Sequence, residues 1–563
     1  MTTTLPSPTG PRAAGIHWDL SPLVADDGEA RPRLDACLER CRAFEAAHRG
    51  ALPGMDGPAL AAALAELAAI DNELSRVSSY AHLRESVDVS AEENQDLSAA
   101  VDRGLVEAGN ALRFFDLEWI ALDEEAARVL HDAPEVAADR HYLVALRRFA
   151  PHTLSEAEER MLSERGPAAT SAWQTLFGRI TSTLELEFDS GEGTEPHTID
   201  RLLAMVREPD RDLRRRALET LYAGLEPHTP TLAHCYDTLV GDRLAMDRLR
   251  GYSGPMEPTH LRNELRGEVV ESMMSAVEEH YPLAHRWFAI KAGLLGIDRL
   301  ELHDQYAPLG EARAVDFPEA TRLIDTSFGR FSPRIAGIAR DFFGQRRIDA
   351  EPRTGKRGGA FCAPVAQDAL PYVLMNFTDR MDDVMTLAHE LGHGMHFALA
   401  AGSQSALSFG TGLALAEVPS TFAELVTFDH LMEVETDPQT RRALISERLE
   451  GSFATVFRQT VLARYEQRAY ALRAEGSALT ADRLSEIWFA ENSRYYGDAL
   501  ALYARFRERG EPFVDDYIGF LAAGGSASPA DLLRPLGVDL DDPAVWDPGF
   551  AEMERLIGVA EAG

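Results

Sequence analysis

The chain has 563 residues, a length at which more than one hydrophobic core is expected. Its 56 lysines and arginines against 91 aspartates and glutamates leave a formal net charge of −35, which opposes binding to nucleic acid or to an anionic membrane. This acidity favours solubility, and a cleft that attracts cationic ligands is the alternative interpretation.

Residues 1–15, "MTTTLPSPTGPRAAG", are rich in threonine, proline and glycine and contain no apolar core segment, so we expect a disordered tail rather than a secretory signal. The longest apolar stretch, residues 59–70, is shorter than a membrane span and is interrupted by Glu66. No membrane-spanning segment is therefore expected.

Four cysteines, too few and too scattered for a disulfide framework, occur in the chain: Cys37, Cys41, Cys235 and Cys362. We expect them to be reduced thiols in a cytoplasmic protein.

The segment 34–188 repeats apolar residues at intervals of three and four, which predicts long amphipathic helices. Turn-forming residues then cluster in "DSGEGTEPHT", residues 189–198, before helical patterns resume. This cluster suggests a boundary between a helical N-terminal domain at 16–195 and a catalytic domain at 196–563.

The pattern changes at residues 355–377, "GKRGGAFCAPVAQDALPYVLMNF", where glycines, prolines and β-favouring residues predict two short strands. Beyond residue 382 the chain becomes helical again, with a glycine-rich interruption at 402–412. The predicted fold class is mostly α, with a small β element directly before the segment "TLAHELGH".

That segment, residues 386–393, contains an H-E-x-x-H motif. On a helix, His389 and His393 lie roughly 40° apart around the axis and one turn along it, so both imidazoles can reach one metal ion. Glu390 projects from the adjacent flank, where it could contact the water that a metal activates. Asp382 or Asp383 is expected to cap the start of this helix, and Gly402 to end it.

Gly392 and Gly394 lie in the middle of the same predicted helix, where each costs roughly 1 kcal/mol relative to alanine. Such a local disadvantage is expected where another group approaches the backbone closely. These glycines therefore favour a functional helix over a merely structural one.

A catalytic zinc site uses three protein ligands, so a third ligand is expected downstream. Glu417 in "ALAEVPSTFAEL" fits, because a loop separates it from the motif helix and Pro419 would fix its position by kinking the new helix or starting it. His396 is the competing candidate, but it lies about 10.5 Å along the helix axis from His389. Glu424 has two open interpretations, orientation of a ligand histidine or a solvated surface position.

The segments "LAHELGHGMH" and "LAEVPSTFAEL" resemble the oligoendopeptidase F branch of the thimet oligopeptidase and neurolysin class of zinc peptidases. "RTGKRGGAF", "PYVLMNFTDRMDDV", "DQYAPL" and "FLAAGGSASPADLLRPLGVDL" extend the resemblance in order over roughly residues 30–560. It implies a zincin-like helical clam or bowl with a deep channel, one zinc ion held by His389, His393 and Glu417, and Glu390 as general base. It also implies cleavage of short unstructured peptides.

One departure from the family concerns the residues after "RYYGDAL", 494–500, where an aromatic-rich segment that contributes to substrate and oxyanion binding is missing. Tyr495, Tyr496 and Tyr503 are candidate replacements, and buried aromatic packing is the alternative role for at least two of them. The departure motivates the alternative function, a zinc-containing peptide-binding protein with reduced or lost catalysis.

Overall fold

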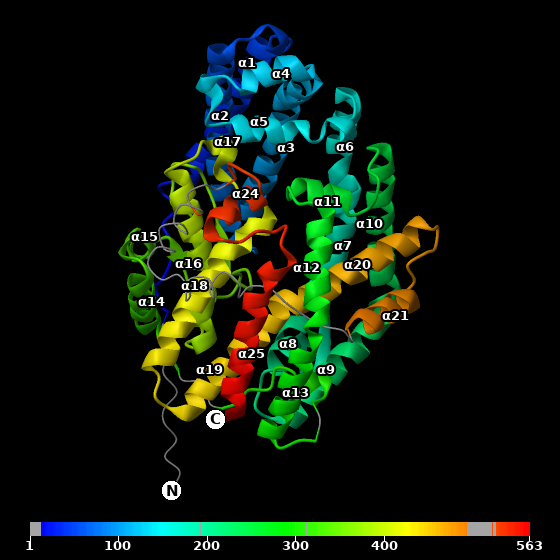
Figure 1. Cartoon of the computed structure of the whole chain (residues 1–563), viewed down its shortest axis with the longest axis vertical. Helices are drawn as coiled ribbons and strands as arrows, with labels where there is room; N and C mark the ends of the chain where they lie inside the picture. Colours follow the sequence, from blue (N-terminus) through cyan, green and yellow to red (C-terminus); the bar gives the residue numbers. More distant parts are fainter. Residues whose placement is uncertain are drawn as a thin grey trace. The chain divides into compact units, whose positions relative to one another are not determined.

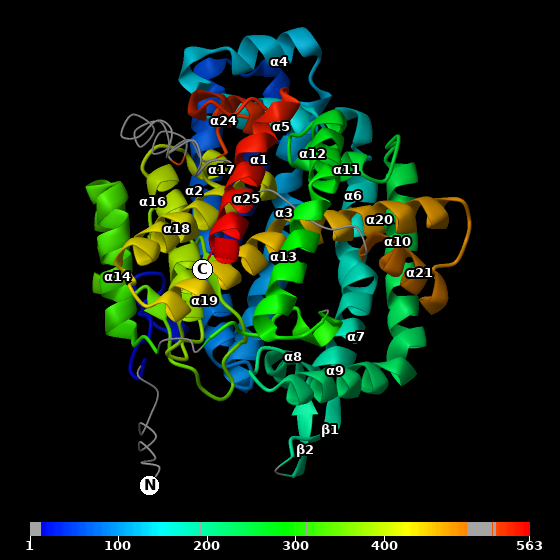
Figure 2. The same cartoon turned by 60° about the horizontal axis from the view of Figure 1, so that its bottom comes forward.

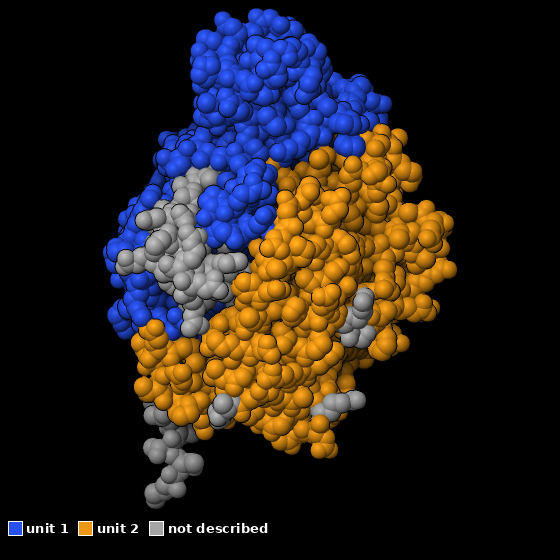
Figure 3. Space-filling model, in the orientation of Figure 1, with its two compact units in different colours: residues 1–163, 313–431, 505–539 blue, residues 164–312, 432–504, 540–563 orange. Residues whose placement is uncertain are grey.

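The computed structural model describes residues 13–191, 193–298, 300–310, 314–492, 521 and 525–562 (Figure 1). Two compact units, each assembled from three stretches of the chain, make up the protein (Figure 3). Unit 1 comprises residues 1–163, 313–431 and 505–539, and unit 2 comprises residues 164–312, 432–504 and 540–563. The domain boundary expected at residue 195 stays a prediction.

Helices dominate unit 1, as the sequence predicts. Their bounds are α1 Asp27–His48, α2 Gly57–Val87, α3 Glu92–Ala121, α4 Glu124–His131, α5 Arg140–Arg147, α6 Glu156–Arg165, α14 Phe317–Phe331, α15 Pro333–Gly344, α16 Met381–Ala401, α17 Ala406–Phe409, α18 Leu413–Val434 and α24 Pro529–Leu533. Helices α6 and α18 each end a few residues beyond the boundary of the unit.

The core of unit 1 joins segments that are far apart in the sequence. Helices α1, α2 and α3 bury large side chains such as Phe44, Phe115 and Trp119, and Tyr372 and Leu374 extend the same apolar cluster. The Tyr372 hydroxyl also donates to the Asp19 carbonyl over 2.7 Å. The first helices and the region before the H-E-x-x-H helix therefore share one interior.

A three-stranded sheet in unit 1 consists of β3 Ile348–Asp349, β4 Phe361–Ala363 and β5 Tyr372–Leu374. The strand order is β3-β5-β4, with β3 parallel and β4 antiparallel to the central β5. The two strands predicted within 355–377 are thus confirmed as β4 and β5. Strand β4 is an edge strand and lies against α16.

Unit 2 is also helical. Its elements are α7 Thr170–Thr183, β1 Glu185–Asp189, β2 Thr194–Thr198, α8 Ile199–Met205, α9 Arg211–Leu225, α10 Thr229–Leu249, α11 Glu257–Arg262, α12 Gly267–Glu279, α13 Tyr281–Leu295, α19 Pro438–Ser452, the π-helix Phe453–Arg458, α20 Gln459–Ala474, α21 Ala481–Asn492 and α25 Asp547–Ala562. Strands β1 and β2 form an antiparallel hairpin, seen at the lower edge of Figure 2. The turn-rich segment 189–198 contains the last residue of β1 and all of β2.

Ion pairs to one buried carboxylate fasten the short 3-10 helix Leu302–Asp304 to α9 within unit 2. Asp304, with no exposed side-chain surface, accepts hydrogen bonds from Arg211 at 2.7 Å and from Arg214 at 2.9 Å. Burial alone would raise the pKa of Asp304, but hydrogen bonds from Arg211, the Glu301 main-chain N–H and Arg214 outweigh it and hold the pKa well below its usual range. The carboxylate stays charged and fixes this short helix to α9.

All four cysteines are free thiols, in agreement with the expectation of reduced cysteines. Within the described part of the chain, no helix combines the length and the apolar character that crossing a membrane requires.

Candidate metal centre

Helix α16 carries the H-E-x-x-H motif and begins with a capping box. The Asp383 carboxylate accepts hydrogen bonds from the main-chain N–H groups of Arg380 at 3.0 Å and Thr378 at 2.7 Å. Of the two aspartates predicted to start the helix, Asp383 therefore does so from the third helical position. The helix ends at Ala401 with Gly402 as its C-cap residue, as predicted.

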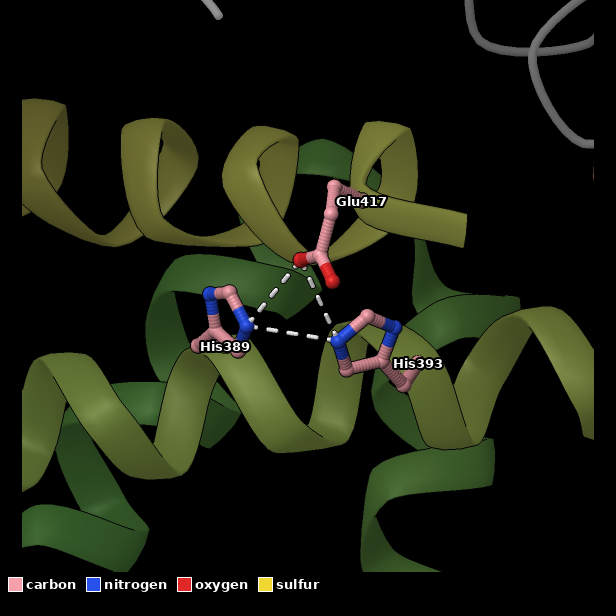
Figure 4. Close-up of side chains that lie close together, drawn as sticks. All are labelled: His389, His393 and Glu417. Carbon is pink, nitrogen blue, oxygen red and sulfur yellow. Dashed lines mark hydrogen bonds and ion pairs between the residues drawn. The ribbon is translucent and has the colours of Figure 1, made fainter. Parts of the chain in front are cut away.

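Three side chains converge between α16 and α18 (Figure 4). The Nε2 atoms of His389 and His393 are 3.2 Å apart. The Glu417 Oε2 atom lies 3.3 Å from His389 Nε2 and 3.4 Å from His393 Nε2. The structure thus brings together the three residues that the sequence predicts as ligands.

The dimensions of this triangle match a tetrahedral zinc ion. Two ligand atoms at about 2.0–2.1 Å from zinc, with a tetrahedral angle between them, lie roughly 3.3 Å apart. The three measured separations, 3.2, 3.3 and 3.4 Å, fall at this value. The donor set of two imidazole nitrogens and one carboxylate oxygen is also one that zinc accepts in catalytic sites.

The electrostatics of the triangle suit a cation. Hydrogen bonds to His389 and His393 hold the pKa of Glu417 well below its usual range, so its carboxylate is ionised throughout the neutral range. Burial would lower the pKa of His389, but contacts with the Glu417 and Glu424 carboxylates raise it to about 10. A metal ion would replace the proton that these carboxylates attract to His389.

A further carboxylate orients His389. Glu424 Oε1 lies 2.6 Å from His389 Nδ1, so Nε2 of the same ring faces the triangle. The Glu424 side chain is 22% exposed, and of the two interpretations left open by the sequence the structure supports orientation of the histidine. Glu424 lies on α18 seven residues after Glu417.

Ser420 is a residue that the sequence analysis missed. Its hydroxyl lies 2.9 Å from Glu417 Oε2 and donates a hydrogen bond that restrains the carboxylate. The sequence indicates this contact only through the spacing of Glu417 and Ser420, because residues three apart on a helix are neighbours. Helix α18 begins at Leu413, so Pro419 lies inside the helix and not in its first turn.

The two mid-helix glycines of α16 are explained by close approaches. A methyl group at Gly392 would lie 2.6 Å from the Pro419 carbonyl oxygen and 2.6 Å from Ser420 Cα, both backbone atoms of α18. A methyl group at Gly394 would lie 2.5 Å from the ring of Phe342. The predicted close approach is confirmed, and at Gly392 it brings the backbones of α16 and α18 into direct contact.

Glu390 lies close to both the triangle and the sheet, since its carboxyl group interacts electrostatically with His389, His393 and Glu417 and also contacts Cys362 on β4. Its side chain is buried, with 6% of the residue exposed, and burial raises the pKa of its carboxyl group. The main-chain N–H of Cys362 on β4 donates a hydrogen bond to the Glu390 carboxylate. This is the location expected for a group that exchanges protons beside a metal.

His396 is buried within α16 and is not part of the cluster that the described residues form. Burial lowers the pKa of His396 to about 4, so its ring is neutral at physiological pH. Tyr495, Tyr496 and Tyr503 lie outside the described residues.

Two family models match the chain. Residues 334–509 match peptidase family M3, a segment that contains α16 and α18. Residues 118–185 match the N-terminal model described as oligopeptidase F. Both matches occur in the order that the resemblance predicts. The chain belongs to the oligoendopeptidase F branch of peptidase family M3.

Curated M3 relatives align over most of their length. Oligopeptidase PepF of Bacillus subtilis is 25% identical over 531 residues, covering 86% of this chain and 79% of the relative. An oligoendopeptidase F homolog of Lactococcus lactis is 24% identical over 586 residues, covering 96% and 97%.

Solved structures share the fold. A putative peptidase from Chlamydophila abortus matches with a TM-score of 0.82 and 21% identity, covering 98% of this chain and 99% of that one. Oligoendopeptidase F from Enterococcus faecium matches with a TM-score of 0.72 and 21% identity, covering 95% and 99%. As an M3 family member with this helical fold, the chain is a peptidase.

Proposed function

We propose that this M3 peptidase is a zinc endopeptidase that hydrolyses internal bonds of short unstructured peptides, with one zinc ion held by His389, His393 and Glu417. The observation that carries the proposal is the convergence of these three donors at separations of 3.2–3.4 Å. Three ligands leave a fourth position for a water molecule or the substrate. The Glu417 side chain is 60% exposed, so this side of the site is open to solvent.

When bound, zinc would lower the pKa of water towards about 7 and polarise the scissile carbonyl. Glu390 takes one proton from the attacking water as the water oxygen bonds to the carbonyl carbon. The same carboxyl group then delivers that proton to the nitrogen of the breaking C–N bond, which leaves as an amine. The raised pKa of Glu390 supports this role, because it makes the carboxylate a stronger base towards the attacking water.

The substrate would bind along the edge strand β4. Among the described residues this strand pairs on one side only, with β5, so its other side can pair with an extended peptide. Gly358 and Gly359 precede the strand and carry no side chain that would obstruct such a peptide. An unstructured peptide can adopt the extended form that this pairing needs, whereas a folded protein cannot.

The test uses two substitutions that are both expected to lower activity but to differ in zinc content. Glu390→Gln is expected to retain one zinc ion per chain and to lose most cleavage of a quenched fluorescent peptide. Glu417→Ala is expected to lose zinc first, with activity lost as a consequence. Glu66→Gln, an exposed glutamate on α2, is the matched control and should change neither readout.

Each outcome separates the candidate functions. Equal turnover by Glu390→Gln would remove Glu390 from the reaction, and unchanged zinc content in Glu417→Ala would assign the third ligand elsewhere. Zinc without any cleavage by the unmodified chain would favour the alternative, a zinc-containing peptide-binding protein. The proposal also retains the cytoplasmic location and short peptides as partners, both inferred from the sequence and the family.

A further inference from the structure

The loop between β3 and β4, residues 350–360, contains all of the motif "RTGKRGGAF" except its final phenylalanine, which begins β4. Lys356 of this motif has no role in the proposed reaction. The Lys356 side chain has no exposed surface. Its ammonium group donates to the main-chain carbonyls of Met375 at 2.6 Å and Glu351 at 3.1 Å, and it pairs with Asp349 Oδ1 at 2.7 Å. One buried cation thus joins the end of β3, the loop and the end of β5.

Asn376 fastens the same loop nearer to β4. Its side-chain amide donates to the Arg357 carbonyl at 3.0 Å and to the Gly359 carbonyl at 3.1 Å. Asn376 belongs to the second motif that the function leaves unexplained, "PYVLMNFTDRMDDV". The two hydrogen bonds of this amide therefore hold residues 357–359, shortly before β4, against the end of β5.

The opposite side of the loop is held by α2. The Arg357 N–H donates to the Ser86 carbonyl at 2.9 Å, and the Val89 N–H donates to the Gly355 carbonyl at 2.8 Å. Gly355 adopts a φ of +85°, which favours glycine, and a methyl group there would lie 2.8 Å from Asp88 Oδ1. The loop is therefore bound by hydrogen bonds on both sides, which is more restraint than a connection between two short strands needs.

Strand β4, directly after this loop, contacts Glu390. The strand begins at Phe361, two residues after the last Asn376 contact, and the Cys362 N–H donates to the Glu390 carboxylate. In the part of the chain that the structure describes, three residue pairs hold β4 to the sheet, all of them with β5. The position of the Cys362 N–H therefore depends on how firmly the preceding loop is held.

We propose that Lys356 and Asn376 are positioning residues for Glu390, because their clamp on the loop fixes the edge strand whose Cys362 N–H orients the Glu390 carboxylate. The inference rests on the proposed function, in which Glu390 moves the proton. The hydrogen bonds of both residues go to the loop and to the ends of β3 and β5, so neither substitution is expected to affect zinc retention. An error of about 1 Å in the placement of a reacting group can lower a rate by up to a hundredfold.

The experiment is a double-mutant cycle on kcat. Asn376→Asp preserves the shape of the side chain but replaces the N–H donors with a carboxylate, which repels the two carbonyl oxygens. It should lower kcat about tenfold in the otherwise unmodified enzyme, with zinc content unchanged. In the Glu390→Gln background it should change the residual kcat by less than twofold, because the group that it positions is already inactive.

If Asn376 had a merely structural role, Asn376→Asp would lower kcat by the same factor in both backgrounds. That result would overturn the inference. Lys356→Met, which removes the other half of the clamp, should behave like Asn376→Asp in the same cycle. Asn263→Asp is the matched control, since Asn263 is the C-cap residue of α11 in unit 2 and its amide donates to the Thr259 carbonyl of that helix. It should leave kcat unchanged in both backgrounds.

Failure of the inference and failure of the proposed function are distinguishable. If Glu390→Gln is inactive while Asn376→Asp keeps full kcat, the clamp is not needed and only the inference fails. If Glu390→Gln itself keeps full kcat, the assignment of Glu390 as the base fails, and the inference fails with it.

Discussion

Replacing Gly392 by alanine should damage the metal centre without touching a ligand. The new methyl carbon would lie 2.6 Å from the Pro419 oxygen and from Ser420 Cα, where ordinary contacts are 3.4–4 Å. Both obstructing atoms belong to the α18 backbone, so no side-chain rotation relieves the clash. Helix α18 must move away from α16 by roughly 1 Å, given the usual contact distance between carbon atoms.

The size of that shift decides the outcome. Metal sites tolerate deviations of about 0.2 Å in their ligand distances, so a displacement of Glu417 by several times that value should weaken zinc binding at least tenfold. Overpacking costs about 1–3 kcal/mol, while exchanging glycine for alanine in a helix gains about 1 kcal/mol. The Gly392→Ala protein should therefore be unchanged in stability or destabilised by up to about 2 kcal/mol.

Zinc titration against a competing chelator and thermal unfolding measure both quantities. Gly109→Ala is the matched control, because Gly109 lies within α3 and a methyl group there meets nothing within 4 Å. The control should gain up to about 1 kcal/mol and keep its zinc affinity. If Gly392→Ala behaved in the same way, the direct contact between α16 and α18 would not be a requirement of the site.

Three further substitutions test other features. Glu424→Gln should lower zinc affinity about 10- to 100-fold in a chelator titration, because it weakens the 2.6 Å contact with His389; an unchanged affinity would contradict the orienting role. Burial raises the pKa of Asp116 from 3.8 to about 6, a difference worth roughly 3 kcal/mol. The ionised group is thus destabilising above pH 6, so Asp116→Asn should stabilise the protein at pH 8 and lose this advantage as the pH falls towards 4, as followed by urea unfolding. Asp304→Asn should cost about 3–5 kcal/mol in the same assay, because it leaves buried Arg214 without its carboxylate partner; a loss below about 1 kcal/mol would contradict this.

The parts of the site that are local in sequence were predictable. The spacing of His389 and His393 specifies a shared helical face, and the helix over this motif ends at the predicted Gly402. Gly392 was recognisable because glycine is locally unfavourable in a helix, although the identity of the approaching group required the structure. Glu417 was predictable because a catalytic zinc site needs a third protein ligand, and the loop after the motif helix lets the chain reverse and bring Glu417 back to it.

Contacts between distant segments were not predictable. Strand β3 has two residues and exists only because Ile348 and Asp349 pair with β5, more than twenty residues later. The sequence of the hairpin β1–β2 predicts a domain boundary, since its turn residues are a stronger local signal than its short strands. The roles of Lys356 and Asn376 depend on carbonyl groups from other elements, which no periodicity reveals.

The shared interior of unit 1 limits how this enzyme can be dissected. Tyr372 and Leu374 of β5 complete the apolar cluster of α1, α2 and α3. Strand β5 belongs to the region directly before α16. A shortened protein beginning after residue 195 would present that face of β5 to water and lack its natural covering. We therefore expect the peptidase activity of this protein to require α1, α2 and α3, because these helices complete the core on which β5 packs.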